Sequence, residues 1–151
     1  MIFDTVMKWL AGETRRPGEP EDLQVAIVAL LVQAARLDDH FDASEREAIE
    51  RMLASRFGLD PERIRRLVET AEARAEESTQ ILPFTRMVVD QLGPPERVQV
   101  IEMLYEVVLA DGTLDPEEDA LVRRIAGLIY VPDHDRGEAR HRARVKLGMA
   151  Q

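Results

Sequence analysis

Apolar positions recur at helical spacing along almost the whole chain. Between Leu23 and Ala35 only Gln24 and Gln33 are polar, which predicts a central helix buried on nearly every side. Further along the chain, apolar residues return every three or four positions, the spacing of one helix face. No run of alternating apolar and polar residues is long enough to predict a strand. The pattern therefore predicts an all-α protein.

Proline, glycine and aspartate residues divide this pattern into about seven to eight helices. Aspartate followed by proline is typical of a helix start, and glycine after the last apolar position is typical of its end. The predicted helices cover residues 1–11, 21–37, 43–57, 61–78, 83–92, 96–110, 115–130 and 133–147. We interpret residues 1–20 as an amphipathic helix with its linker, and residues 21–151 as a compact helical domain.

An acidic turn between two helices occurs twice, at a constant offset. The matching pairs are Asp38 with Asp111, Phe41 with Leu114, Asp42 with Asp115, and Glu45 with Glu118. Each of the two helical hairpins leaves an apolar face that the other can cover. The repeat therefore predicts two hairpins that face each other across an approximate two-fold axis.

Helix capping is one interpretation of the acidic turns. Asp42 and Asp115 stand at N-cap positions, where a carboxylate accepts hydrogen bonds from free backbone N–H groups. Glu45 and Glu118 follow three residues later, close to the pattern of a capping box. This interpretation needs no ligand, and the spacing taken alone slightly favours it.

Capping gives no role to Asp38 and Asp111, which are predicted at the end of the preceding helix, where the dipole disfavours carboxylates. A hard divalent cation, such as Ca²⁺, Mg²⁺ or Mn²⁺, would remove their repulsion, and Zn²⁺ suits such ligands less well. The EF-hand pattern fails, because Pro116 and Val122 stand where it needs Gly and Glu. Gly112 suits a left-handed position after the helix. The candidate metal ligands are Asp38, Asp42, Glu45, Asp111, Asp115 and Glu118.

Composition excludes several function classes for this 151-residue chain. The net charge of −9 argues against general nucleic-acid binding, and the lack of cysteine excludes disulfides and thiolate sites. We find no secretory signal, no apolar segment that could span a bilayer, and no nucleophile, phosphate-loop or HExxH motif. We therefore expect a cytoplasmic protein that is not an enzyme.

Two further groups carry charge on helical faces. His134, Glu138 and His141 share one face and could bind Zn²⁺, but a solvated surface is the favoured interpretation. Glu102 and Glu106 lie one turn apart on an otherwise apolar helix, and we expect them to form its solvent-facing stripe.

The last predicted helix is strongly basic. It either neutralises the acidic surface on which it packs or touches anionic lipid or an acidic partner. Its basic residues are Arg136, Arg140, Arg142, Arg144 and Lys146.

Two segments resemble the signature segments of the TerB-like family, named for tellurite-resistance protein B. They are LLVQAARLDDHFDASEREAI and LYEVVLADGTLDPEEDALVRRIAGLIYVPDHD, and the likeness extends from about residue 21 to 144. The resemblance implies a compact all-helical fold with pseudo-two-fold symmetry. It also implies a divalent-cation site at the six carboxylates named above, and an association with stress-response systems linked to the membrane.

Two hypotheses follow from these observations. The first is a non-enzymatic domain that binds a divalent cation through one or both acidic turns, in a stress-response or membrane-associated complex. The second is a protein-interaction or scaffold module whose acidic turns are only caps. Its partner, an unidentified protein or the membrane surface, would then bind the N-terminal amphipathic helix or the basic last helix.

Overall fold

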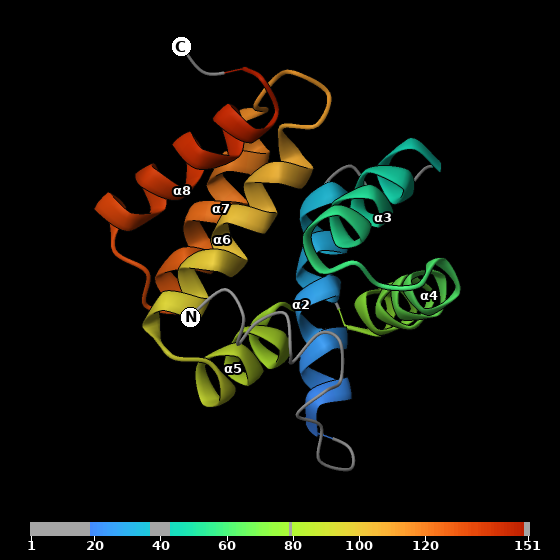
Figure 1. Cartoon of the computed structure of the whole chain (residues 1–151). Helices are drawn as coiled ribbons and strands as arrows, with labels where there is room; N and C mark the ends of the chain where they lie inside the picture. The colour runs from blue at the N-terminus through green and yellow to red at the C-terminus, as the bar shows by residue number, and fades with distance from the viewer. Residues whose placement is uncertain (1–18, 37–42, 79, 150–151) are drawn as a thin grey trace.

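The protein is all-helical, as its sequence predicts. The computed structural model describes residues 19–36, 43–78 and 80–149, and within these ranges it contains seven helices and no strand (Figure 1). The helices are α2 (Glu19–Ala35), α3 (Ala43–Phe57), α4 (Pro61–Glu77), α5 (Leu82–Gln91), α6 (Pro94–Val108), α7 (Pro116–Leu128) and α8 (Asp133–Lys146). The helix predicted over residues 1–11 lies outside the described residues, and the division at residue 20 stays a prediction.

The local signals for helix ends operate as predicted. Asp60 is the N-cap of α4, and its Oδ1 accepts a hydrogen bond from the backbone N–H of Glu62 at 3.3 Å. Pro61 occupies the first helical position, where a missing N–H costs nothing. Helix α3 ends before Gly58, which adopts a left-handed φ of 61° that glycine tolerates without strain.

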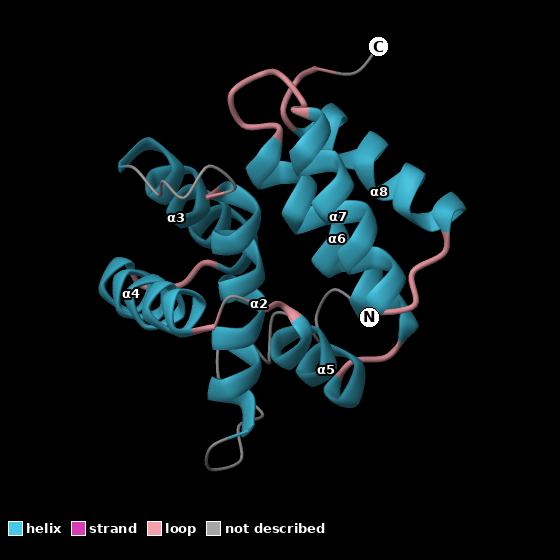
Figure 2. Cartoon of the chain, turned by 180° about the vertical axis from the view of Figure 1, so that it is seen from behind, coloured by secondary structure: helices cyan, strands magenta, loops and turns pink. Residues whose placement is uncertain are grey.

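Helix α2 is the centre of the molecule. Every apolar residue from Leu23 to Ala35 is buried, which confirms the prediction from its nearly uninterrupted apolar sequence. It contacts α3, α4, α5, α6 and α7. Figures 1 and 2 show it between the α3–α4 pair on one side and α6, α7 and α8 on the other. The side-chain amide of Gln33 donates to the carbonyls of Ala75 and Ser78, which joins α2 to the end of α4.

Helix α6 is the second buried helix, and it contacts α7 and α8. The Tyr105 hydroxyl donates to Asp119 of α7 at 3.1 Å and accepts from Arg136 of α8 at 3.1 Å. Burial of this hydroxyl raises the pKa of Tyr105. On α8 only the small residues Ala139 and Ala143 are buried. The docking of α8 therefore depends on close approach and polar contacts more than on large apolar side chains.

The hairpins α2–α3 and α6–α7, which carry the sequence repeat, contact each other. Their relation by an approximate two-fold axis stays a prediction. Among the described residues, no helix is both long and apolar enough to cross a membrane.

Candidate divalent-cation site

The second acidic turn caps helix α7. Asp115 is the N-cap, and its Oδ1 accepts a hydrogen bond from the backbone N–H of Glu117 at 2.8 Å. The backbone N–H of Asp115 donates to Oε1 of Glu118 at 3.3 Å, which completes a capping box. Gly112 has a φ of 94°, in the left-handed region predicted for it. The capping interpretation is therefore confirmed for Asp115 and Glu118.

Asp111 has a local role that the sequence analysis did not foresee. Its Oδ1 accepts hydrogen bonds from the backbone N–H of Thr113 at 3.1 Å and from the Thr113 hydroxyl at 3.3 Å. Helix α6 ends at Val108, so Asp111 lies in the turn beyond the last helical residue. Free of the helix, its side chain can fold back on the chain, as short acidic side chains commonly do in turns. Asp111 therefore has a local hydrogen-bonding role that is separate from helix capping.

Of the three candidate ligands in the first acidic turn, the structure describes only Glu45. Asp38 and Asp42 lie outside the described residues, and Glu45 stands in the first turn of α3. Glu45 lines a hollow of about 260 Å³ together with Asp111, Asp115 and Glu118. The repeated carboxylates that the structure describes therefore line one hollow between the two hairpins.

The pKa of Glu118 reflects both the partial burial of this side chain and the negative charges beside it. It is raised from its ordinary value of 4.5 to about 7, chiefly because the side chain is partly buried. The charges of Asp111, Asp115 and Glu45 raise the pKa of Glu118 further, whereas the hydrogen bond from the Asp115 N–H lowers it. Ionisation of Glu118 is therefore less favourable in the folded chain than in water.

A second hollow of about 330 Å³ is also lined by Glu45, Asp111 and Glu118. Small apolar residues of α2, α3 and α6 line much of the rest, together with Arg51. Among the described residues that line either hollow there is no histidine and no cysteine. A set of carboxylate oxygens without nitrogen or sulfur suits a hard cation.

Sequence reasoning missed Glu117, which lines the smaller hollow with the repeated carboxylates. Its counterpart in the first copy of the repeat is Ser44, so the comparison of the two copies gave it no weight. Its position next to Glu118 in the first turn of α7 was the available signal, because the first turn of a helix favours acidic residues.

Glu102 and Glu106 are not a solvent-facing stripe, contrary to the prediction. Both are buried, and the guanidinium of Arg56 contacts both carboxylates. From α8, Nε of Arg142 donates to Glu102 at 2.6 Å, and Nζ of Lys146 lies 3.8 Å from Glu106. The physical reason is tertiary, because α3 and α8 cover this face of α6. Part of the basic last helix thus neutralises the acidic residues on which it packs, one of the two roles considered for it.

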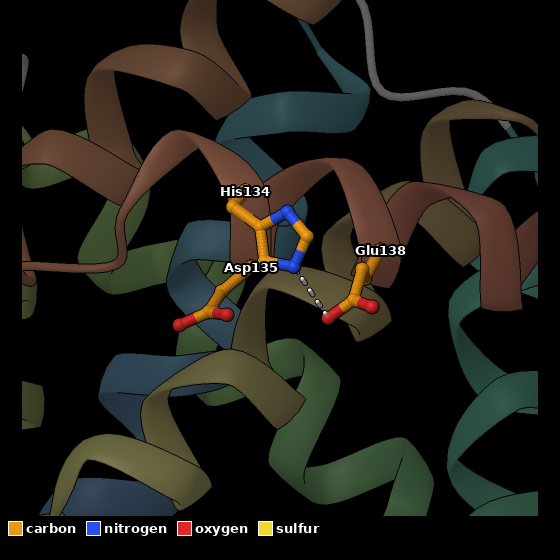
Figure 3. A group of neighbouring side chains, drawn as sticks. All are labelled: His134, Asp135 and Glu138. Carbon is orange, nitrogen blue, oxygen red and sulfur yellow. Dashed lines mark ion pairs between the residues drawn. The ribbon is translucent and has the colours of Figure 1, made fainter.

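On α8, His134, Asp135 and Glu138 are neighbouring side chains (Figure 3), of which His134 and Glu138 are exposed. Nε2 of His134 lies 3.6 Å from Oε1 of Glu138, and Asp135 completes a group whose ligand atoms lie within 4.8 Å of one another. His141 lines a neighbouring shallow hollow with Glu138. The His134 side chain is 82% exposed and the group sits on a single helix, so the favoured interpretation stays a solvated face.

These observations define an all-helical domain in which Glu45, at the start of α3, shares a hollow with carboxylates of the turn before α7 and of the start of α7. The chain matches the model of the family described as tellurite resistance protein TerB over residues 24–141, and it belongs to that family. No curated protein matches the chain.

A similar solved structure is that of a protein of unknown function, PG1108, from Porphyromonas gingivalis W83. The TM-score is 0.62 with 18% sequence identity, over 82% of this chain and 89% of that one. At this identity the likeness shows the fold alone.

Proposed function

We propose that the protein is a non-catalytic domain that binds a divalent cation between its two acidic turns. The observation that carries the proposal is the shared hollow, where Glu45 of the first hairpin meets Asp111, Asp115 and Glu118 of the second. The raised pKa of Glu118 adds support, because burial of the side chain raises it most and the charges of Asp111, Asp115 and Glu45, which a cation would offset, raise it further.

The polar side chains of the smaller hollow offer only oxygen atoms, which favours Ca²⁺, Mg²⁺ or Mn²⁺ over Zn²⁺. A cation held by Glu45 and by Asp111 or Glu118 would join the start of α3 to the turn between α6 and α7. Asp38 and Asp42 stay proposed ligands from the repeat. A bound ion would therefore fasten the two hairpins to each other at this end of the molecule.

The alternative, a scaffold module whose acidic turns are only caps, has less support. Capping accounts for Asp115 and Glu118. It gives no reason for Glu45 of a separate helix to share their hollow, where its charge raises the pKa of Glu118. A role in stress response, a cytoplasmic location and an unidentified protein partner stay proposals that follow from the family and the composition.

Thermal melting tests the proposed site. The protein is melted in EDTA and then with Ca²⁺, Mg²⁺, Mn²⁺ or Zn²⁺ added singly. An ion at about 100 times its Kd stabilises the folded state by about 2.7 kcal/mol, so one of the hard cations should raise the Tm by several degrees.

Three variants locate the response. Glu45→Gln and Glu118→Gln should each reduce the ion-induced rise in Tm, because each removes a ligand. Glu69→Gln, on the exposed surface of α4, is the matched control and should keep the full response. The proposal fails if no ion at millimolar concentration shifts the Tm of the unsubstituted protein.

A further inference from the structure

The two ends of α3 have charged side chains in contrasting surroundings: acidic neighbours of like charge at its start, and a buried ion pair at its end. Near its start, Glu45 shares a hollow with Asp111 and Glu118, which carry the same charge. Near its end, Arg56 is buried against the carboxylates of Glu102 and Glu106. The helical rise places Glu45 and Arg56 about 16 Å apart along the axis. Like charges therefore gather near the start of α3, whereas opposite charges attract each other near its end.

The attracted end is fixed by several directed hydrogen bonds. The Arg56 side chain is only 3% exposed. Its Nε donates to Glu106 at 3.0 Å, one terminal nitrogen donates to Oε1 of Gln99 at 3.1 Å, and the other contacts the carboxylates of Glu102 and Glu106. A planar guanidinium has rigidly placed donors, so this contact sets both the distance and the rotation of α3 on α6.

The carboxylates that receive Arg56 are themselves held from the other side. Arg142 bonds Glu102 at 2.6 Å, and the ammonium of Lys146 lies near Glu106. Both of these α8 side chains are 46% exposed, whereas the carboxylates are buried. Because α8 restrains Glu102 and Glu106, they form a fixed anchor for α3.

We propose that Arg56 is a positioning residue for the cation site. By anchoring α3 on α6, it keeps Glu45 at the hollow that Asp111 and Glu118 also line, against the repulsion among the three carboxylates. This inference rests on the proposed function. Ligands that are placed before the ion arrives bind it more tightly, because the ion does not have to order them.

The first test measures the position of α3 without any ion. The chain has no cysteine, so spin labels can be attached specifically at Glu47→Cys on α3 and Ala120→Cys on α7, both exposed positions that do not line either hollow. Pulsed electron paramagnetic resonance in EDTA then gives the distribution of distances between the labels. Arg56→Lys should broaden this distribution, because one ammonium cannot replace the planar guanidinium that contacts Gln99, Glu102 and Glu106 together.

The matched control is Arg65→Lys, the same substitution on the exposed surface of α4, where Arg65 is 62% exposed and lies 3.8 Å from Glu62 of the same helix. It should leave the distance distribution unchanged, because Arg65 takes no part in the contact between Arg56 and the carboxylates of α6. Arg56→Met extends the series and should broaden the distribution more than Arg56→Lys. If Arg56→Met does not fold, Arg56→Lys carries the test alone. An unchanged distribution in a folded Arg56 variant would overturn the inference.

The second test is a double-mutant cycle in ion affinity, measured by titration calorimetry. Arg56→Lys should weaken binding about ten-fold, the lower end of the effect of losing a residue that orients metal ligands. Glu45→Gln should then reduce ion affinity by a smaller factor in the Arg56→Lys background than in the unsubstituted protein, because Glu45 is no longer held at the site. A general loss of stability would leave the two effects additive.

The outcomes separate the inference from the proposed function. Ion binding by the unsubstituted protein, combined with additive effects of Arg56→Lys and Glu45→Gln, would overturn the positioning role and leave the cation site intact. A complete lack of ion binding by the unsubstituted protein would overturn the cation site and, with it, this role for Arg56.

Discussion

The two ends of α3 place carboxylates in contrasting environments. At the start of the helix, Glu45 shares an open hollow with four other carboxylates, and water screens their charges. At its end, Glu102 and Glu106 are buried, and Arg56, Arg142 and Lys146 surround them. The two groups have similar chemistry but differ in access to solvent and in the cations beside them.

This difference follows from the cost of removing charge from water. An ionised carboxylate in a protein interior costs several kcal/mol unless cations and hydrogen bonds compensate it, so the buried pair needs its basic neighbours. Exposed charges interact by only about 0–1 kcal/mol, so the acidic hollow persists without full compensation. Carboxylates that are not fully neutralised are the ones available to an added cation.

The largest effect should come from the buried group. Arg56→Ala leaves Glu102 and Glu106 without their central partner and should lower the free energy of unfolding by about 3–5 kcal/mol, as measured by urea denaturation. Arg51→Ala is the control on the same helix, because Arg51 is 70% exposed and lies 3.9 Å from Glu47. It should change the free energy of unfolding by less than about 0.5 kcal/mol. Similar losses of unfolding free energy in the two variants would contradict the difference between the buried and the exposed charges of α3.

A smaller effect should appear in the pH dependence of the acidic hollow. The pKa of Glu118 is about 7 in the folded chain against an ordinary 4.5, so between these values the folded chain binds more protons than the unfolded one. This contribution to stability is complete below pH 4.5 and is lost as the pH rises through 7. It should amount to about 1 kcal/mol at most, because the side chain is partly exposed and its charge is screened.

Denaturation in EDTA at several pH values measures this contribution. Glu118→Gln should remove it and flatten the curve between pH 5 and 7. A cation favours the ionised carboxylate, so ion affinity should decrease as the pH falls through the same range. An identical pH profile for the variant and the unsubstituted protein would exclude the raised pKa of Glu118.

The smallest effect should come from the turn itself. Asp111→Asn removes a charge, while its Oδ1 can still accept the hydrogen bonds of Thr113, so the ion-free protein should gain about 0.5 kcal/mol of stability. Asp38→Asn should act in the same way. The gain should vanish in 1 M salt, which screens exposed charges. Stability that is unchanged at low salt would mean that repulsion in the hollow is negligible.

The helices were predictable because their signals are local. The range 43–57 and the Asp60–Pro61 start were predicted as observed, since they depend on spacing and on capping within a few residues. The capping box of Asp115 and Glu118 was equally local. The role of Asp111 was missed because it depended on α6 ending at Val108, about two residues before the predicted end.

The sequence by itself determined the all-helical class, the central place of α2, and the paired acidic turns that identify the family. Only the tertiary structure decided that Glu45 shares a hollow with Glu118, and that Glu102 and Glu106 face Arg56 instead of water. Helical periodicity shows which residues share a face but does not show what covers that face. Whether a carboxylate stays exposed or becomes part of a buried ionic network depends on that cover, because burial sets the cost of its charge.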